Sequence, residues 1–382
     1  GIDMRDTTLQ VRGAKGYDPV TGAISFPIYQ SATFRHPALH QSTGYDYSRV
    51  KNPTREELEN SVAALERGSR CWAFSSGMAG IGALLKLFRT GDHILLSEDL
   101  YGGTVRICNA IYSKFGISFE YIDTSDIEVV KAKIQNNTKA IFVETPSNPM
   151  MLVSDIAAIS ELAHAHQALL IVDNTFLSPH FQKPLTLGAD IVIHSGTKYL
   201  CGHNDVVAGL VIAKDIPQVI DELDLIYKSE GASLGPFDSW LMLRSIKTLG
   251  LRVEKQEKNA LQIASWLKTL PTVTDVYYVG LKDHPSYELT LKQTTGFGGM
   301  ISFKVKSAKI AEEALGKLKL IYFAESLGGV ETLLTYPIEQ THAEAPKELL
   351  ARVGVDERLL RLSVGIEDVE DLKEDLEQAL AE

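Results

Sequence analysis

The feature that most restricts the fold of this chain is a regular alternation of strand-like and helix-like segments. Short runs rich in β-branched and aliphatic residues occur at 94–96, 117–122, 140–143, 169–172, 191–193 and 206–213. Stretches of helical periodicity, such as 155–166, separate them. Parallel strands need crossovers of this length, so the pattern predicts a mostly parallel α/β sheet covered by helices on both faces. Ligands bind such sheets at the carboxyl ends of the strands.

The rest of the sequence predicts two further parts around this large domain, which we place at residues 61–255. Residues 4–53 hold many turn formers and little regular pattern, which indicates an N-terminal arm, placed at residues 4–60, that lies across another surface. Residues 256–382 carry their own apolar pattern, with strand candidates at 276–279, 299–305 and 359–363 and an amphipathic helix at 369–380. A smaller C-terminal α+β domain is therefore expected.

Two helix starts stand out near the arm. Residues 54–57 have capping-box spacing, and apolar residues follow at helical intervals up to Gly68. Small residues at 75–80 open a second helical pattern that continues up to Gly91. The free amides of Gly77 and Met78, at the positive end of a helix dipole, predict an anion site. Close helix packing through glycines is the alternative interpretation.

Three of the predicted strands end in polar clusters. These are ETPSNP (144–149), DNT (173–175) and SGTK (195–198). Lys198 lies with two hydroxyls at the end of its strand, where burial or cationic neighbours lower an amine's pKa enough for Schiff-base chemistry. A surface lysine on a loop is the alternative for this turn alone. The convergence of three clusters favours a site.

The residue types in these clusters fit an aldehyde cofactor such as pyridoxal 5′-phosphate. Lys198 would carry the aldehyde, Asp173 would keep the ring nitrogen protonated, and Tyr101 would lie against the ring. A charge-assisted hydrogen bond to the nitrogen contributes about 1.5–3 kcal/mol. Candidate phosphate donors are Arg49, Gly77, Met78, Ser195 and Thr197.

Arg361 is a further candidate, because it lies within the apolar strand candidate 359–363. A buried guanidinium without a partner is costly. We therefore expect Arg361 to meet a carboxylate, either from the protein or from a ligand.

Composition excludes several other classes of function. The chain of 382 residues has a net charge of −11 and no basic run, which argues against nucleic-acid or acidic-membrane partners. No apolar run reaches membrane-spanning length, and no signal peptide is evident. Cys71, Cys108 and Cys201 are scattered, which favours reduced thiols in a cytoplasm, and no metal site is expected. A GxGxxG turn for a dinucleotide-binding oxidoreductase is missing.

Taken together, the motifs resemble those of the Cys/Met-metabolism family of pyridoxal-phosphate enzymes, which includes cystathionine γ-synthase, γ-lyase and β-lyase. The resemblance covers nearly the whole chain. It rests on YDYSRVKNPTR (45–55), FSSGMAG (74–80), DLYGGT (99–104), ETPSNP (144–149), VDNTF (172–176), SGTKYLCGHND (195–205), AESLGG (324–329) and LLRLSVGIED (359–368). It implies a fold type I enzyme, usually a homotetramer in which two subunits share each active site.

The resemblance also implies roles for individual residues. Lys198 would bind the cofactor and move protons, and Tyr101 would stack on the ring and take a proton from the incoming amine. Asp173 would pair with the ring nitrogen, and Asn148 would contact the ring hydroxyl. The implied phosphate ligands are Gly77, Met78, Ser195 and Thr197, with Tyr47 and Arg49 reaching across from the neighbouring subunit. Arg361, Asn148 and Ser326 would hold the substrate α-carboxylate.

Within the family, the likeness favours a γ-synthase-like reaction on an O-acylhomoserine with cysteine, and some similar bacterial enzymes also use sulfide. Asp46, Arg106 and Glu325 match positions that carry charges toward the far end of a cystathionine-sized ligand, although each could be an ordinary surface charge. Gly103 stands where methionine γ-lyases usually have cysteine. Cystathionine β-lyase or γ-lyase activity is the main alternative, and a catalytically silent oligomer of the same fold is a remote one.

Overall fold

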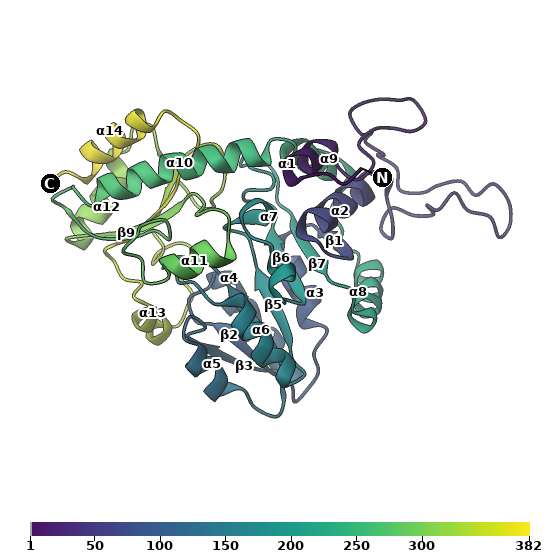
Figure 1. The fold of residues 1–382 in the computed structure, drawn as a ribbon, viewed down its shortest axis with the longest axis horizontal. Coiled ribbons are helices and arrows are strands. Elements are labelled where there is room, and N and C mark those ends of the chain that lie inside the picture. The colour runs from purple at the N-terminus through teal and green to yellow at the C-terminus, as the bar shows by residue number, and fades with distance from the viewer. Residues whose placement is uncertain (1) are drawn as a thin grey trace.

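The computed structural model describes residues 2–382 and contains two β-sheets with helices packed against them (Figure 1). The large sheet has seven strands, in the spatial order β1 (Arg70–Phe74), β7 (Gly209–Ala213), β6 (Ile191–Ser195), β5 (Leu169–Asp173), β4 (Thr138–Glu144), β2 (His93–Ser97) and β3 (Ser118–Ile122). Every adjacent pair from β6 to β3 is parallel, whereas β7 is antiparallel to β6 and β1. The predicted mostly parallel α/β sheet is confirmed.

Strand β4 shows how both faces of this sheet are buried. Ala140 and Phe142 pack in one cluster with residues of α3 (Gly77–Leu85), α4 (Gly102–Ala110) and α8 (Pro217–Glu230). Ile141 and Val143 pack in a second cluster with residues of α5 (Ile127–Lys133) and α6 (Ile156–Ala165). Because successive side chains point to opposite faces, a strand covered on both sides needs a continuous apolar run. This is why these strands could be recognised in the sequence.

The second sheet is smaller and largely antiparallel. Its spatial order is β10 (Tyr322–Phe323), β11 (Leu333–Thr335), β12 (Leu359–Ser363), β9 (Met300–Val305) and β8 (Val273–Tyr277). Helices α12 (Ala308–Lys317) and α14 (Val369–Leu380) contribute to its apolar core. The long helix α10 (Leu249–Leu267) runs from the N-terminal side of the molecule to this sheet (Figure 1). The predicted domain boundary at residue 255 falls inside α10, and the division into domains stays a prediction.

Four further helices and two 3₁₀ turns connect or flank these elements. They are α7 (Ser178–Phe181), α9 (Pro236–Ile246), α11 (Tyr287–Gln293), α13 (Lys347–Val353) and the 3₁₀ turns at Tyr112–Phe115 and Pro184–Leu187. No helix within residues 2–382 combines the length and the apolar character needed to cross a bilayer.

Several element limits differ from the predicted ones. The run at 206–213 becomes a strand only at Gly209, because the Ala208 carbonyl accepts hydrogen bonds from Gly196 and Thr197 in the turn before Lys198. The run at 276–279 is the end of β8, and Tyr278 leaves the strand to donate its hydroxyl proton to the Gly298 carbonyl at 2.7 Å. The strands β1, β10 and β11 were not foreseen.

The helix expected from residue 54 is α2 (Pro53–Glu66), and its cap differs from the predicted one. Asn52 is the N-cap, since its side chain accepts from the amides of Thr54 and Arg55. The Thr54 hydroxyl instead accepts from the Tyr29 amide at 2.9 Å and donates to the Pro27 carbonyl at 2.8 Å. The threonine therefore fastens the arm to α2. The second predicted helix, α3, ends at Leu85 rather than near Gly91.

The N-terminal arm is more ordered at its start than predicted. Residues Asp6–Arg12 form helix α1, which lies against α2 and α10. Gln10 is buried, and its amide pairs with His180 at 2.8 Å and accepts from the Gly250 amide at 3.0 Å. Beyond α1 the arm contains no helix before Pro53 and extends away from the body of the molecule (Figure 1).

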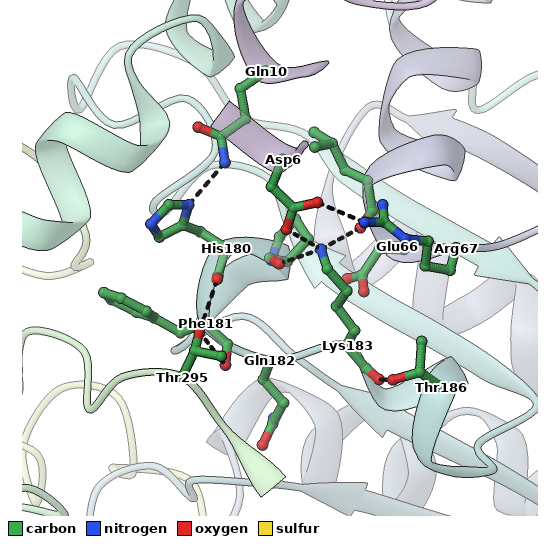
Figure 2. Close-up of polar contacts among 12 residues, drawn as sticks. Asp6, Gln10, Glu66, Arg67, His180, Phe181, Gln182, Lys183, Thr186 and Thr295 are labelled. Carbon is green, nitrogen blue, oxygen red and sulfur yellow. Dashed lines mark hydrogen bonds and ion pairs between the residues drawn. The ribbon is translucent and has the colours of Figure 1, made fainter. Parts of the chain in front are cut away.

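A small charge cluster fastens α1 to the large domain. Figure 2 shows Asp6 between the side chains of Arg67 and Lys183, at 2.7 and 2.8 Å. The Lys183 ammonium also donates to the carbonyls of Leu65 and Pro179. Burial alone raises the pKa of Asp6, but the hydrogen bonds and charges of Lys183 and Arg67 outweigh burial and hold that pKa below its ordinary value.

Replacement of Asp6 should therefore loosen α1. We expect Asp6→Asn to lower the free energy of unfolding by about 1 kcal/mol, because two partly exposed ion pairs are lost while Lys183 keeps its carbonyl partners. Thermal denaturation at pH 7 measures the effect, and Asp3→Asn, at an exposed position, is the matched control. The difference should shrink as the pH falls through the lowered pKa of Asp6, because the stabilisation needs the ionised carboxylate. Equal melting temperatures at pH 7 would contradict this role.

Candidate active site

Polar side chains from the carboxyl ends of β4, β5 and β6 line one pocket of about 550 Å³. The small sheet contributes to the pocket through β12 and the segment before β11. All but three of the predicted site residues line it, namely Gly77, Met78, Tyr101, Arg106, Asn148, Asp173, Ser195, Thr197, Lys198, Glu325, Ser326 and Arg361. The structure thus brings together groups that lie up to 284 positions apart, from Gly77 to Arg361.

Lys198 lies in the turn that follows β6. Its ammonium donates to the Ser326 hydroxyl at 2.9 Å. Burial and then the nearby charge of Arg361 lower the pKa of Lys198 to about 8, against the opposing influence of Asp173 and Glu325. The turn is held from the other sheet, since a Cβ on Gly328 would lie 2.8 Å from the Lys198 backbone. The amine is therefore recessed, positioned and easily deprotonated.

Arg361 is the buried cation of the pocket. It lies on β12 with 1% of its surface exposed, and it donates to Asn148 Oδ1 at 3.1 Å and to the Ser326 carbonyl at 2.9 Å. Its Nε has no hydrogen-bond partner, and no carboxylate of the described residues pairs with it. Burial lowers the pKa of Arg361 to about 10, so it stays charged at neutral pH. A guanidinium held in this way is prepared for an anion from outside the chain.

Two carboxylates occupy neighbouring strand ends. Asp173 and Glu144 are direct partners in the β4–β5 pairing, and burial raises the pKa of both. Asp173 Oδ1 accepts from the Thr175 amide at 3.0 Å and from its hydroxyl at 2.6 Å, while its other oxygen has no hydrogen bond from residues 2–382. Glu144 accepts from the Tyr101 amide at 3.2 Å. The other carboxylate oxygen of Asp173 can therefore accept a hydrogen bond from one more donor.

A buried layer of polar groups supports the end of β5. His194, on β6, pairs with Glu66 of α2, and both side chains are almost completely buried. Asn174 donates to the same glutamate at 3.1 Å and to the Gln182 carbonyl at 2.8 Å. Because the charge of His194 also lowers the pKa of Asp173, this layer opposes the effect of burial on that carboxyl.

The start of α3 offers donors at another side of the pocket. Ser76 caps the helix by accepting from the Ala79 amide at 3.0 Å, which leaves the amides of Gly77 and Met78 without an intrahelical acceptor. Gly77 lies so close to β6 that a Cβ there would be 3.3 Å from Ser195. With the Ser195 and Thr197 hydroxyls in the same pocket, this corner suits a phosphate group.

Tyr101 lies at the N-cap position of α4, where its amide donates to Glu144, and is about one third exposed. Gly103 leaves room for its ring, because a Cβ on that residue would approach the ring to 2.8 Å. A side chain at position 103 would therefore displace Tyr101 from this position.

The pocket has two electrostatically different parts. We call the recessed part around Lys198, Asp173 and Arg361 the inner half. The outer half comprises the exposed side chains of Arg106, Glu325 and Glu344. There Arg106 Nη1 donates to Glu344 Oε2 at 2.9 Å.

The three remaining predicted residues, Asp46, Tyr47 and Arg49, do not line the pocket of their own chain. Arg49 donates to the Lys228 carbonyl at 3.1 Å, and its guanidinium lies 5.0 Å from the Tyr47 ring centre. Asp46 accepts from the Ser42 hydroxyl at 2.6 Å. Their predicted contribution to a neighbouring subunit's site stays a prediction.

Some pocket residues were missed in the sequence. Glu144 and Thr175 stand inside motifs that were recognised, so their positions at strand ends could have identified them. Glu344 belongs to a loop without a recognised strand or helix pattern, and the buried His342 of the same loop lies beside the pocket lining, between Thr341 and Ala343. His342 Nε2 donates to the carbonyls of Leu100 and Asn148, at 3.0 and 3.2 Å. Within residues 2–382, no group of three His, Cys, Asp or Glu side chains could hold a metal ion.

Comparison with known proteins identifies the family. The model of the Cys/Met metabolism PLP-dependent enzymes matches residues 7–381. The chain belongs to this family. Like its relatives, it is a pyridoxal-phosphate-dependent enzyme of trans-sulfuration, with the fold type I architecture.

The relatives carry different activity names at almost the same identity. Cystathionine γ-lyase of Bacillus subtilis (strain 168) is 50% identical over 377 residues, which cover 99% of each chain. Cystathionine β-lyase of Lactococcus lactis subsp. cremoris (strain MG1363) is 49% identical, with 98% of each chain covered. Cystathionine γ-synthase/O-acetylhomoserine (thiol)-lyase of B. subtilis (strain 168) is 49% identical, over 96% of this chain and 93% of the relative.

A solved structure agrees with the fold over its whole length. The crystal structure of cystathionine γ-lyase from Lactobacillus plantarum, complexed with L-serine, superposes with a TM-score of 0.96 at 44% identity and covers 98% of each chain. Identity alone therefore does not separate synthase from lyase.

The residues of the pocket fit pyridoxal phosphate. The free Asp173 oxygen suits a protonated ring nitrogen, and the unpaired amides of Gly77 and Met78 suit the phosphate. The amine of Lys198 lies in the same pocket and suits the aldehyde. Each end of the cofactor thus has a chemically matching group.

The pKa of Lys198 predicts how the family's apoenzyme should take up its cofactor. The amine reacts only when unprotonated, so the rate of reconstitution with pyridoxal phosphate should rise with pH and level off above a midpoint near 8. An ordinary lysine would give a midpoint of about 10.4. Stopped-flow absorbance measures the rate. Arg361→Met removes a neighbouring cation and should move the midpoint upward, whereas an unchanged midpoint would show that Arg361 does not influence the amine.

The Nε2–H donor of His342 should contribute to the stability of the protein. His342→Leu leaves two buried carbonyls without a partner and should lower the free energy of unfolding by about 1–3 kcal/mol. His342→Gln retains an N–H donor and should recover part of the loss. Burial and then the charge of Arg361 lower the pKa of His342 to about 4, below its ordinary value of 6.5. Unfolding therefore takes up a proton at pH 6 but not at pH 8 in the wild type alone, so the loss caused by His342→Leu should be smaller at pH 6 than at pH 8. Denaturant unfolding of holoenzyme measures it, and an equal loss in both variants would argue for packing alone.

Proposed function

We propose that this enzyme catalyses γ-replacement on an O-acylhomoserine in the manner of a cystathionine γ-synthase, with cysteine as the nucleophile and sulfide as a second candidate. The extent of the pocket supports the proposal. From Lys198 the lining continues to Arg106 and Glu325, so an amino acid held at the inner half can extend toward charges of both signs. Cystathionine, the product with cysteine, carries an ammonium and a carboxylate at its far end.

The proposed cofactor contacts follow from the inner half. Asp173 binds the ring nitrogen, Asn148 contacts the ring hydroxyl, and Tyr101 lies against the ring. The phosphate is bound by Gly77, Met78, Ser195 and Thr197 of this chain and by Tyr47 and Arg49 of a neighbouring subunit. We place Asp46 of that neighbouring subunit at the outer half.

Lys198 is the proposed catalytic base. Bound pyridoxal phosphate supplies an electron sink, which makes protons on the carbons near the substrate nitrogen acidic. With a pKa of about 8, roughly one Lys198 in ten is unprotonated at pH 7, against roughly one ordinary lysine in several thousand. The Ser326 hydroxyl, 2.9 Å away, keeps the amine in the pocket between proton transfers. Tyr101 is proposed to accept a proton from the incoming amino group.

Arg361 is proposed to hold the substrate α-carboxylate, with help from Asn148 and Ser326. Arg361 donates to the Ser326 carbonyl while Lys198 donates to the hydroxyl of the same residue. One residue therefore sets the distance between the base and the carboxylate-binding cation. In the net reaction the Cγ–O bond breaks, the acyl group leaves as a carboxylate, and the thiol sulfur forms the Cγ–S bond after losing its proton.

Cleavage of cystathionine is the second candidate function. It needs the same base, the same carboxylate site and the same charged outer half, and relatives named β-lyase and γ-lyase are as similar as the one named γ-synthase. The two reactions differ in whether a nucleophile adds at Cγ or a C–S bond breaks to release a keto acid.

We also propose that the enzyme is a cytoplasmic homotetramer in which pairs of subunits share their sites. The exposed arm supports this proposal, because Tyr47 and Arg49 lie outside the pocket of their own chain. Three buried free thiols are compatible with a reducing compartment.

A two-way substrate panel tests the reaction. Holoenzyme with O-acetyl-L-homoserine and cysteine should form cystathionine, and Lys198→Ala should lower this rate by at least about 10³-fold, because the base contributes roughly 10²–10⁴ and its loss also weakens cofactor binding. Liquid chromatography with mass detection measures the product. Rapid release of pyruvate or 2-oxobutyrate from cystathionine, with no cystathionine synthesis, would replace the proposal by the lyase function. If the enzyme neither forms cystathionine nor releases a keto acid from it, the result would indicate the catalytically silent oligomer.

A further inference from the structure

The outer half contains an ion pair whose acidic member was not recognised in the sequence. Arg106 and Glu344 meet at 2.9 Å, and both side chains line the pocket. They come from distant parts of the chain, α4 and the loop between β11 and α13. Their exposed fractions of 57% and 65% mean that a ligand in the pocket can reach either group.

The loop that carries Glu344 packs on the start of α4. A Cβ on Gly102, at the start of α4, would lie 2.2 Å from the Thr341 carbonyl, so the loop packs directly on the helix that carries Arg106. His342 donates to the Leu100 carbonyl just before the same helix. Glu344 follows two residues later, so backbone packing places it within reach of Arg106.

The remaining charge of the outer half is negative. Glu325 also lines the pocket and has no ion pair or side-chain hydrogen bond with residues 2–382. With Arg106 paired to Glu344, the carboxylate of Glu325 is the charge of the outer half that has no ion-pair partner among residues 2–382, and the cations on which it acts, Lys198 and Arg361, belong to the inner half. A lone carboxylate entering this region would compete with Glu344 for Arg106 and approach Glu325 with like charge.

We propose that Glu344 is a specificity-determining residue, which by pairing with Arg106 makes the outer half select against substrates that end in a lone carboxylate. A neutral far end, such as that of an acetyl ester, meets no such competition. A zwitterionic far end can place its ammonium against Glu325. The inference rests on the proposed function and names its substrate class, an O-acylhomoserine with an uncharged acyl group.

The first test compares two esters in the holoenzyme. In the wild type, kcat/KM with cysteine should be higher for O-acetyl-L-homoserine than for O-succinyl-L-homoserine. Glu344→Gln should raise the succinyl-to-acetyl ratio of kcat/KM by roughly three- to fivefold, the scale of one exposed ion pair. Arg106→Met/Glu344→Gln should lose this gain, because the cation that the succinyl carboxylate would meet is gone.

Glu339→Gln is the matched control. Glu339 lies on the same loop, is exposed and does not line the pocket, so the variant removes an equal charge without touching Arg106. Its succinyl-to-acetyl ratio should equal that of the wild type. The same gain in Glu339→Gln, or no change of the ratio in Glu344→Gln, would overturn the inference.

An equilibrium measurement separates this inference from the proposed function. L-2-aminopimelate ends in a carboxylate, and L-2-aminoheptanoate has the same chain length but ends in a methyl group; neither carries a leaving group on Cγ. By calorimetric titration, Glu344→Gln should favour L-2-aminopimelate over L-2-aminoheptanoate by roughly three- to fivefold relative to wild type. If no homoserine ester reacts, the proposed function fails while this ratio still decides the role of Glu344. An unchanged ratio overturns that role even if the esters react.

Discussion

Two cationic groups, the Lys198 amine and the Arg361 guanidinium, occupy the same recessed half of one pocket. Their proximity is electrostatically unfavourable, and the surrounding groups determine how each of them responds. Like charges in a poorly solvated place disfavour each other's ionisation. Burial lowers the pKa of Arg361 to about 10, so it keeps its charge at neutral pH, whereas burial and then the charge of Arg361 lower the pKa of Lys198 to about 8. Arg361 is satisfied only by neutral oxygens, and its Nε has none. The pocket thus combines a reactive amine with a guanidinium that has no anionic partner among residues 2–382.

The pairing of these cations depends on how the two sheets meet. Lys198 follows β6 of the large sheet, and Arg361 lies on β12 of the small one. The segment before β11 joins them, because Gly328 packs on the Lys198 backbone while its amide donates to the Ser363 hydroxyl of β12 at 2.8 Å. A shift of one sheet against the other would therefore change the distance between Lys198 and Arg361. The buried cores of both sheets hold that distance, as the roles proposed for the two residues require.

The parts of this structure that sequence reasoning predicted are those set by short-range pattern. The parallel strands could be recognised because burial on both faces demands apolar runs, and Lys198 and Asp173 could be placed because polar residues follow those runs. Strands β10 and β11, with two and three residues, are too short for a pattern to appear. The position of Glu344 and the role of His342 could not be predicted, because both arise from a loop that folds back on α4. The His342–Leu100 contact spans 242 positions. No local signal encodes it.

The contrast between the two halves of the pocket explains how one architecture can support several reactions. The inner half is tied to both sheets, and a substitution there disturbs buried charges and hydrogen bonds as well as chemistry. The outer half consists of exposed charges whose pairing contributes only about 0.2–1 kcal/mol. Substitutions there should have little effect on the stability of the fold. A difference of about 1 kcal/mol nevertheless changes the ratio of affinities for two substrates about fivefold. Relatives with three different activity names at 49–50% identity are compatible with such a division. In the function proposed here, the exposed charges of the outer half act on the choice of substrate, while Lys198 and Arg361 of the inner half act on the bound amino acid.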